Sequence, residues 1–260
     1  MQDLDIVIPV YNEGDKITEV LELLCKKVTA RSRILICYDF EEDNTLPYVR
    51  DFVAQQRTDS VEIVLVCNTG CGGHEAIMTG FSKSSAKAVL VYMADDFQNM
   101  DLIDSMLTKI STGKDIVSAS RFIPGGEMVG CPWLKAIMVR MAAFTLYYLA
   151  AVPCRDPTNS FRMFSRRIID TITIETRDGF AFSLELLVKV HRLGWGVEEV
   201  PARWIERDLE NSQSRFKVLK WLPQYLQWYF YAFATTYLFR PSKSVPRQFP
   251  DRFQEHINSD

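Results

Sequence analysis

Short apolar runs and helically spaced apolar residues alternate along the first half of this chain. Runs rich in β-branched residues occupy positions 6–10, 34–38, 61–67, 88–93 and 116–119. Between them, helical spacing is shown by two sets of apolar residues: Ile17, Val20, Leu21 and Leu24, then Val49, Phe52 and Val53. Because the runs are apolar on both faces, the pattern predicts an α/β fold with a mostly parallel central sheet flanked by helices.

The second half of the sequence is less regular. A long apolar stretch at 133–151 is interrupted by Lys135 and Arg140. Helical spacing at 182–193 precedes a predicted strand at 197–205, and an aromatic-rich apolar segment occupies 221–239. We expect three parts: an α/β domain at 1–216, an amphipathic helix at 217–240 and a polar tail at 241–260.

Polar or glycine-rich residues follow each of the first four predicted strands. They are Tyr11-Asn12-Glu13-Gly14, Asp39 with residues 41–44, Asn68-Thr69-Gly70-Cys71-Gly72-Gly73, and Ala94-Asp95-Asp96-Phe97-Gln98. Ligands of parallel α/β sheets bind beyond the carboxyl ends of the strands. One polar loop there is ordinary solvated surface, but four on the same edge indicate a single ligand crevice.

The adjacent carboxylates Asp95 and Asp96 are the most informative pair in these loops. Two neighbouring acids repel each other unless a cation or another partner neutralises them. Mg²⁺ and Mn²⁺ favour one or two carboxylates together with diphosphate oxygens. The alternative is a helix N-cap, because Leu102, Ile103 and Met106 follow at helical spacing. Gln98 and the other three loops favour the metal.

The remaining loops leave alternatives open. Asp39 is either an acceptor for a nucleobase edge or a turn acid, and Glu13 either caps the following helix or contacts the base and ribose. Glycines 70, 72 and 73 allow close approach of the backbone to a ligand. The chain has neither a Walker lysine motif nor the Gly-x-Gly-x-x-Gly spacing of dinucleotide binding, so phosphoryl and hydride transfer lose support.

Composition narrows the class of protein. Apolar residues make up 47% of the chain, enough to bury a core, and the net charge of −3 gives no support to a nucleic-acid partner. The early start of the first strand argues against a signal peptide. The six cysteines have no disulfide spacing, which favours reduced thiols in a cytosolic compartment. Cys67, Cys71 and His74 are close enough in sequence for a metal site, although a plain glycine-rich loop is favoured.

Seven motifs occur in the order of a known enzyme family. They are Ile8 to Glu13, Tyr38-Asp39 through Asp43-Asn44-Thr45, Asn68-x-Gly70 with Ala76 and Gly80, Met93 to Gln98, Ser120-Arg121-Phe122, Asp156 to Arg162, and Ser214-Arg215-Phe216. This set resembles family 2 glycosyltransferases, which have the Rossmann-like GT-A fold, and in particular their polyprenyl-phosphate branch, which includes dolichol-phosphate mannose synthase. The resemblance covers about residues 4–216, which it identifies as a catalytic domain.

The resemblance implies a role for residues in each motif. The nucleotide would be held by Pro9, Tyr11, Glu13, Asp39, Asn68, Gly70 and Asp95. Asp96 and Gln98 would bind Mg²⁺ or Mn²⁺. Acceptor or phosphate contacts would come from Arg121, Ser160, Arg207, Ser214 and Arg215, since arginine suits phosphate through its planar fork. For each arginine, a surface salt bridge is the alternative.

Several positions depart from the family pattern. Ala94 stands in place of the first aspartate of the metal motif, Tyr38 in place of an acid, and Phe40 in place of a glycine. Asn159-Ser160 stands in place of Ser-Gly. These departures fit either a divergent subfamily with another sugar or acceptor, or an inactive nucleotide-sugar-binding protein.

The family mechanism is inverting transfer of the sugar from a UDP- or GDP-sugar donor. A phosphate acceptor is already anionic and needs no strong base, whereas a hydroxyl acceptor would need a carboxylate, for which Asp156 and Glu185 are candidates. Asp96, Arg121, Asp156 and Glu185 are therefore the predicted catalytic residues. The acceptor is expected to be a polyprenyl phosphate or lipid-linked saccharide. The alternative is a soluble hydroxyl acceptor in surface-polysaccharide synthesis, and a nucleotidyltransferase has less support because no early basic glycine-rich motif is present.

The segment 221–239 predicts contact with a membrane. Trp and Tyr prefer the membrane interface, and Lys217, Lys220 and Arg240 flank the segment. Pro223 and two glutamines disfavour a spanning helix, which needs roughly 20 apolar residues. We expect peripheral association with the cytoplasmic membrane face, with 133–151 as a second interfacial helix. A buried core helix or a contact in a homo-oligomer are the alternatives.

Overall fold

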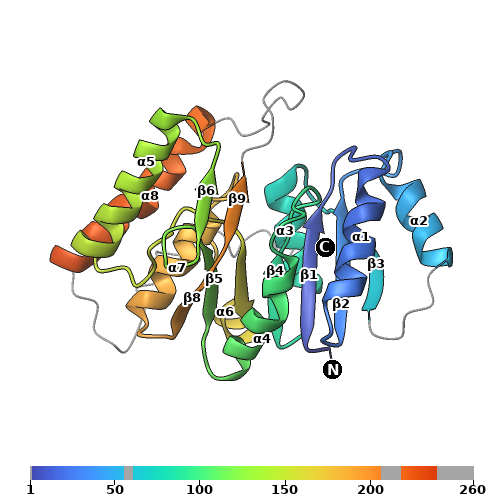
Figure 1. Cartoon of the computed structure of the whole chain (residues 1–260), viewed down its shortest axis with the longest axis horizontal. Coiled ribbons are helices and arrows are strands. Elements are labelled where there is room, and N and C mark those ends of the chain that lie inside the picture. Colours follow the sequence, from blue (N-terminus) through green and yellow to red (C-terminus); the bar gives the residue numbers. More distant parts are fainter. Residues whose placement is uncertain (1, 56–60, 206–217, 239–260) are drawn as a thin grey trace, which may run out of the picture.

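The computed structural model describes residues 2–55, 61–205 and 218–238 (Figure 1). Its strands are β1 (Leu4–Pro9), β2 (Ser32–Tyr38), β3 (Val61–Cys67), β4 (Ala88–Val91), β5 (Ile116–Ser120), β6 (Glu127–Val129), β7 (Arg162–Ser165), β8 (Val197–Pro201) and β9 (Arg203–Ile205). Its α-helices are α1 (Lys16–Lys27), α2 (Leu46–Gln55), α3 (Gly73–Lys83), α4 (Ile103–Ser111), α5 (Trp133–Phe144), α6 (Arg166–Thr171), α7 (Phe182–Arg192) and α8 (Val218–Tyr237). A short 3₁₀ helix, η1 (Met100–Leu102), precedes α4, and a π-helix, η2 (Thr145–Leu149), continues α5.

A central sheet of seven strands has the order β3-β2-β1-β4-β7-β5-β8. All neighbours in it are parallel except β7, which is antiparallel to both β4 and β5. The carboxyl ends of β1 to β5 and of β8 therefore lie at one edge of the sheet. This arrangement confirms the predicted mostly parallel α/β fold.

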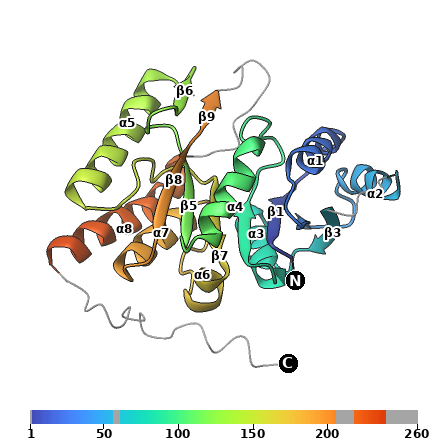
Figure 2. The ribbon, with the colours of Figure 1, turned by 60° about the horizontal axis from the view of Figure 1, so that its bottom comes forward.

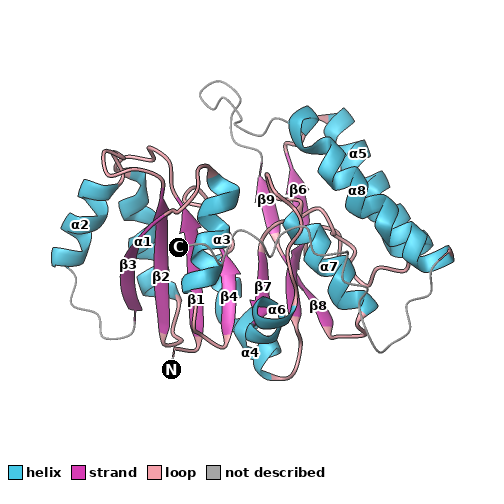
Figure 3. Cartoon of the chain, turned by 180° about the vertical axis from the view of Figure 1, so that it is seen from behind, coloured by secondary structure: helices cyan, strands magenta, loops and turns pink. Residues whose placement is uncertain are grey.

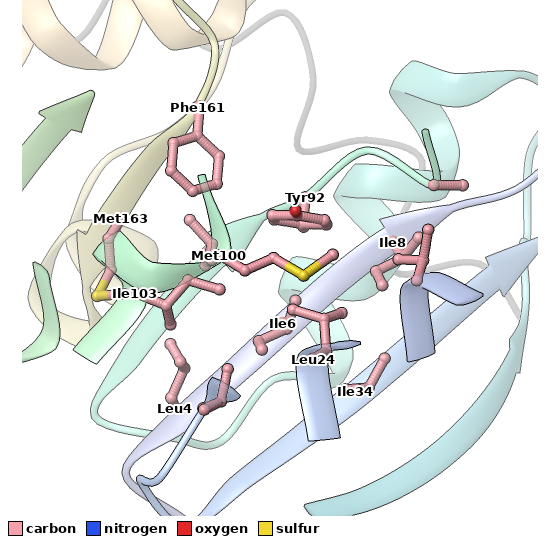
Figure 4. Packing of buried hydrophobic residues seen from close by; sticks show 14 of the residues in the cluster. Leu4, Ile6, Ile8, Leu24, Ile34, Tyr92, Met100, Ile103, Phe161 and Met163 are labelled. Carbon is pink, nitrogen blue, oxygen red and sulfur yellow. The ribbon is translucent and has the colours of Figure 1, made fainter. Parts of the chain in front are cut away.

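Helices cover both faces of this sheet (Figure 3). Leu4, Ile6 and Ile8 of β1 belong to one buried cluster, which includes apolar residues of α1, α2 and α4 (Figure 4). Val7 belongs to the second cluster, on the opposite face, with residues of α3, α6, α7 and α8. Helix α3 approaches the sheet closely at Gly80, where a Cβ atom would collide with Val7.

The structure differs from the sequence prediction in the second half of the chain. The predicted strand at 197–205 is divided at Ala202, because β8 completes the central sheet whereas β9 pairs with β6 in a second, two-stranded sheet. The short elements β6, β7 and α6 were not predicted. Strand β7 has only four residues, too few to show a periodicity of its own.

The two apolar helical segments of the second half have different surroundings. Trp228 and Ala232 of α8 are buried in the second cluster, and Trp228 Nε1 donates to Thr176 Oγ1 at 2.9 Å. Helix α5 is mostly uncovered, and Ala143 is its one buried residue. Figure 2 shows α5 and α8 at the end of the molecule away from α1 and α2. Within the described residues, none of the helices is both long enough and apolar enough to cross a membrane.

Candidate active site at the carboxyl edge of the sheet

The loops after β1 and β2 are joined into one unit by hydrogen bonds. Three successive backbone N–H groups donate to three side chains of the other loop: Asn12 to Asp43 (3.0 Å), Glu13 to Thr45 (2.9 Å) and Gly14 to Asn44 (2.9 Å). Asp43 and Thr45 are buried, and Asn12 has a positive φ of 53°. Because these contacts cross between loops, the predicted nucleoside residues Tyr11, Glu13 and Asp39 lie on one connected support.

Asp39 is oriented by the glycine-rich loop after β3. Its carboxylate accepts hydrogen bonds from Asn68 Nδ2 at 2.7 Å and from the Gly72 backbone N–H at 2.8 Å. Gly72 has a φ of 91°, a conformation that favours glycine. Asn68 Oδ1 in turn accepts from the Gly70 N–H and from Thr79 Oγ1. The structure thus brings Asp39, Asn68 and Gly70 together, as the sequence predicted.

Two aromatic rings accompany these polar groups. Tyr11 is 51% exposed, and its ring meets that of Phe40 edge-on at a centroid distance of 5.7 Å. Pro9, which ends β1, is buried. Tyr38 stands where the family resemblance leads us to expect an acid. It donates to Glu41 Oε1 at 2.5 Å, and that hydrogen bond together with burial raises the pKa of its phenol to about 12. Tyr38 is therefore a neutral donor that holds Glu41.

The loop after β4 places Asp95 and Asp96 differently. Asp95 is exposed, whereas Asp96 is half-buried and its Oδ1 accepts the Gln98 backbone N–H at 2.9 Å. The Tyr92 hydroxyl donates to the Asp96 carbonyl at 2.6 Å, and burial together with the charges of Asp96 and Asp95 raises the pKa of Tyr92. Ala94 points into the first core cluster, so the loop offers its carboxylates from the next two positions.

Asn99 connects this loop to the second sheet. Its Nδ2 atom is 3.4 Å from Asp96 Oδ2 and donates to the Arg203 carbonyl at 3.0 Å. Its Oδ1 atom accepts the Arg203 N–H at 3.1 Å. Asn99 is buried, and the sequence prediction did not include it. The available signal was its position directly after the Asp-Asp-Phe-Gln motif.

Arg121 forms a two-pronged ion pair with Asp156. Its Nε and Nη2 atoms each lie 2.7 Å from a carboxylate oxygen of Asp156, and its backbone N–H donates to the same group at 2.9 Å. Thr158 Oγ1 accepts a further hydrogen bond from Nη2 at 3.0 Å. The Asp156 side chain is completely buried. Asp156 therefore orients Arg121 at the end of β5, and a role as base stays a prediction.

Aromatic rings connect Arg121 to helix α5. The Arg121 guanidinium lies 5.3 Å from the ring centroid of Phe122 and 5.9 Å from that of Trp204. The same two rings carry the cations of α5: Arg140 lies over Phe122 at 5.3 Å, and Lys135 over Trp204 at 4.8 Å. Both α5 cations were noted in the sequence, but their proximity to Arg121 required the fold.

Ser160, the neighbouring predicted acceptor contact, is half-buried in the loop that enters β7. Its neighbour Asn159 holds this loop to β5 by donating to the Ala119 carbonyl at 2.9 Å. The loop therefore lies at the carboxyl edge of the sheet, close to Arg121.

Glu185, the second predicted base, has structural partners on and beside α7. Its oxygens accept the backbone N–H groups of Glu175 and Thr176, and Lys189 Nζ lies 2.7 Å away. The side chain is completely buried. The contacts place Glu185 in an ion pair that holds the segment before α7, and a catalytic role stays a prediction.

Arg207, Ser214 and Arg215, predicted to contact phosphates, lie outside the described residues, as does the tail at 241–260. His74, weighed with Cys67 and Cys71 as a metal site, is buried, and its Nδ1 atom lies 3.0 Å from the Gly179 carbonyl oxygen.

The loop after β4 suits a divalent metal ion that takes some of its ligands from the substrate. Within the parts of the chain that the structure describes, no group of three His, Cys, Asp or Glu side chains could hold a metal ion. Mg²⁺ commonly uses one or two carboxylates and takes its other ligands from substrate phosphates and water. Asp96, oriented by the Gln98 N–H and beside exposed Asp95, meets that smaller requirement.

Comparison with known proteins identifies the family of this chain and relatives of similar sequence. Residues 5–173 match the family described as Glycosyl transferase family 2. The chain is 27% identical over 233 residues to polyprenol monophosphomannose synthase of Mycolicibacterium smegmatis, covering 83% of this chain and 85% of that protein. It is 28% identical over 214 residues to undecaprenyl-phosphate mannosyltransferase of Micrococcus luteus, with 80% and 85% covered.

Solved structures agree in fold. Glucosyl-3-phosphoglycerate synthase from Mycobacterium tuberculosis, in complex with uridine diphosphate, has a TM-score of 0.64 at 14% sequence identity and covers 90% of this chain and 80% of its own. The same enzyme in complex with Mn²⁺, uridine diphosphate and glucosyl-3-phosphoglycerate has a TM-score of 0.61 at 15% identity, with the same coverage. At these identities the likeness concerns the fold alone.

Proposed function

This chain belongs to glycosyl transferase family 2 and has a GT-A-like fold, and from that premise we propose that it transfers a sugar from a nucleoside-diphosphate sugar to a polyprenyl phosphate. The observation that carries the proposal is that three structures lie along the same carboxyl edge of the sheet. These are the oriented Asp39, the Asp96 loop and the ion pair of Arg121 with Asp156. Their order along this edge suits a nucleoside, a diphosphate and an acceptor.

The donor side uses the loops after β1, β2 and β3. Asp39, held by Asn68 and the Gly72 N–H, presents acceptor oxygens to a nucleobase edge. Tyr11, half of whose surface is exposed, offers a ring face for the base or ribose. Pro9, Glu13, Gly70 and Asp95 complete the proposed nucleotide contacts. Either UDP or GDP satisfies this description.

Asp96 and Gln98 are the residues that would hold Mg²⁺ or Mn²⁺. A bound divalent ion offsets the negative charge that develops on the leaving nucleoside diphosphate. The backbone N–H of Gln98 fixes one carboxylate oxygen of Asp96, and Asn99 approaches the other. The family's usual first aspartate has no counterpart at buried Ala94, so Asp95 is its proposed substitute.

An anionic acceptor is favoured over a hydroxyl. Both carboxylates that could act as a base, Asp156 and Glu185, are completely buried and paired with a cation. A phosphate needs no strong base, and Arg121, which Asp156 orients, is its proposed contact. The names of the two relatives, which refer to polyprenol and to undecaprenyl phosphate, support the same acceptor class. Transfer to a soluble hydroxyl acceptor is the alternative. We place the enzyme at the cytoplasmic membrane face, where such a lipid is held.

Thermal unfolding of the full chain with UDP or GDP tests the donor side. Each nucleotide is added with Mn²⁺, with Mg²⁺ or with a chelator, and one nucleotide is expected to stabilise the protein only when a metal is present. The gain should reach about 2.7 kcal/mol at a nucleotide concentration 100-fold above Kd. Metal-independent stabilisation would instead favour an inactive nucleotide-sugar-binding protein.

Asp96→Asn is the decisive variant. The amide keeps an acceptor for the Gln98 N–H but loses the negative charge, so the fold should persist while metal-dependent stabilisation by the nucleotide disappears. Asp101→Asn is the matched control, because Asp101 is a nearby exposed acid with a side-chain exposure of 69%. Equal behaviour of the two variants would refute the metal role of Asp96. Sugar transfer to a short-chain polyprenyl phosphate then identifies the donor from a panel of nucleotide sugars.

A further inference from the structure

Two adjacent residues of β9 contact both halves of the candidate site. The backbone of Arg203 is hydrogen-bonded to Asn99, which belongs to the loop of Asp96. The ring of Trp204 lies beside the guanidinium of Arg121, with 5.9 Å between the ring centroid and the Cζ atom. The first contact is on the proposed donor side of the site and the second on the proposed acceptor side. Because the two residues are neighbours in one strand, a displacement of this pair affects both sides.

The donor end of this connection depends on one side-chain amide. Asn99 Oδ1 accepts the Arg203 N–H at 3.1 Å, and Asn99 Nδ2 donates to the Arg203 carbonyl oxygen at 3.0 Å. The same nitrogen lies 3.4 Å from Asp96 Oδ2, and Asn99 is only 9% exposed. An amide carries its donor and acceptor atoms in one plane, so the three contacts set its orientation together. A change in the position of the Asp96 carboxylate therefore turns the amide and shifts the backbone of Arg203.

The acceptor end depends on aromatic rings around Arg121. Phe122 also contacts its guanidinium, at 5.3 Å, and the ring of Trp204 has Lys135 Nζ at 4.8 Å as a second cation. Asp156 accepts hydrogen bonds from Nε and Nη2 of Arg121, so Nη1 is the nitrogen of the guanidinium outside this ion pair. A ring beside a cation attracts it and limits the positions that it can take. Trp204 therefore helps to fix Arg121 in the orientation that an acceptor phosphate would meet.

Strand β9 is attached firmly at its start and depends on these contacts further along. The N–H of buried Ala202 donates to the Ser120 carbonyl oxygen at 2.9 Å, which attaches this point of the chain to the end of β5. Beyond it, β9 belongs to the two-stranded sheet with β6, and each strand has three residues (Figure 1). A two-stranded sheet is marginally stable by itself. The contacts at the two ends of the connection are thus a large part of what positions Arg203 and Trp204.

We propose that Trp204 is a positioning residue that couples the binding of the two substrates. A ligand held at the Asp96 loop fixes Asn99 and the β9 backbone, and with them the ring that restrains Arg121. Ordering of Arg121 is then partly complete before the acceptor arrives, so the acceptor binds more tightly when the nucleotide is present. Linkage requires the acceptor to tighten nucleotide binding by the same factor. The coupling rests on the proposed function, because its two ligands are a nucleotide and a lipid phosphate.

Direct electrostatics between the two ligands would have the opposite sign. A nucleoside diphosphate remains an anion when one divalent ion is bound to it, and the acceptor phosphate is an anion too. Like charges held in neighbouring subsites weaken the binding of each other. The sign of the coupling therefore distinguishes a connection through the protein from an effect of the two ligand charges on each other.

Isothermal titration calorimetry on the full chain measures this coupling. A short-chain polyprenyl phosphate is titrated into the protein alone, and into the protein saturated with Mn²⁺ and with the nucleotide, UDP or GDP, that stabilises it. Because no sugar donor is present, no transfer takes place. The coupling ratio is the Kd for the polyprenyl phosphate without the nucleotide divided by the Kd with it. The unaltered protein should give a ratio of at least about five.

Variants at both ends of the connection test the role of Trp204. Trp204→Leu should make the two Kd values equal while Mn²⁺-dependent nucleotide binding is kept, whereas Trp204→Phe keeps a ring for Arg121 and should keep most of the coupling. Asn99→Ala, measured at saturating Mn²⁺, breaks the other end and should also lower the ratio. The control is Trp195→Leu, because Trp195 also lies beneath an arginine, Arg167 at 3.7 Å, but just before β8, at the opposite edge of the sheet. Its ratio should equal that of the unaltered protein.

Two results would overturn the proposal. One is a set of equal Kd values with and without the nucleotide in the unaltered protein, and the other is a coupling ratio that neither Trp204→Leu nor Asn99→Ala changes. A purely structural role would lower the unfolding temperature or weaken both ligands without changing the ratio. Failure of the unaltered protein to bind either ligand counts against the proposed function as well, whereas binding of both ligands without coupling counts against the role of Trp204 alone.

Discussion

At the scale of single residues, Asn99 is the least expected part of the site. It hydrogen-bonds in both directions with the backbone of Arg203, from which it is separated by 104 positions, and it also approaches Asp96. A side chain with these contacts can hold the carboxylate that would bind the metal in one orientation. Mutation of residues that orient metal ligands in this way typically lowers metal affinity by about 10- to 100-fold.

Asn99→Ala is expected to weaken metal binding at Asp96 without loss of the fold. The Mn²⁺ concentration that gives half of the nucleotide-dependent stabilisation should rise by about tenfold or more, because Asp96 loses a neighbour that orients it. Thermal unfolding over a Mn²⁺ titration measures this. The unfolding temperature without ligands controls for damage to the fold, and an unchanged Mn²⁺ midpoint would show that Asn99 does not position Asp96.

At the scale of elements, α5 and α8 are both rich in apolar residues but have different surroundings. Helix α8 hydrogen-bonds to η2 and the residue after it, through Tyr229, Thr236 and Tyr237. Its Trp228 is 1% exposed, contacts Thr176 and lies beneath Lys189. Helix α8 thus closes the second core cluster, while α5 keeps one apolar side uncovered.

Trp228→Ala is expected to destabilise the whole protein. Removing a buried indole from a core leaves a cavity and costs about 3–5 kcal/mol in the free energy of unfolding. Phe230→Ala on the same helix is the control, because Phe230 is 62% exposed, and should change stability by less than about 0.5 kcal/mol. Urea unfolding monitored by circular dichroism compares them. Similar values for both variants would mean that α8 unfolds separately from the α/β domain.

At the scale of the whole molecule, the two edges of the sheet at which its strands begin and end have different roles, one in the candidate site and one in stability. The carboxyl edge carries the loops of the site, and the opposite edge carries a buried ionic contact at Asp5. The Asp5 carboxylate, completely buried, accepts hydrogen bonds from Arg33, from Ser84 and from the N–H groups of Ser85 and Ala86. It joins β1, β2 and the segment before β4, so it stabilises the framework on which the site depends.

The Asp5 contacts predict how stability depends on pH. Burial opposes ionisation, but the hydrogen bonds from Arg33, Ser84 and the two N–H groups outweigh it, and the pKa of Asp5 is lowered. A carboxylate with a lowered folded-state pKa contributes stability in full above its unfolded pKa, about 3.9, and loses it as the pH falls through the folded value.

Asp5→Asn should therefore lower the free energy of unfolding by about 2 kcal/mol near neutral pH. The difference from the unaltered protein should shrink as the pH falls below about 4. Urea unfolding at a series of pH values measures it, with Asp3→Asn as a control, since the Asp3 pair with Lys87 is exposed and surface pairs contribute little. A difference that is independent of pH would mean that the charge of Asp5 does not stabilise the fold.

Local patterns in the sequence determined the fold class of this protein and the edge of the sheet that carries the candidate site. Runs that are apolar on both faces must be covered on both faces, which predicts a parallel sheet, and the polar residues at strand ends then share an edge. Both follow from local periodicity, and the order of motifs identified the family. The tertiary structure alone decided which distant residues meet. Arg121 and Asp156 are 35 positions apart, and they pair because antiparallel β7 enters between β4 and β5. It also decided that α8 is covered while α5 is exposed, because burial depends on which neighbours pack against a helix, and its own sequence does not state them.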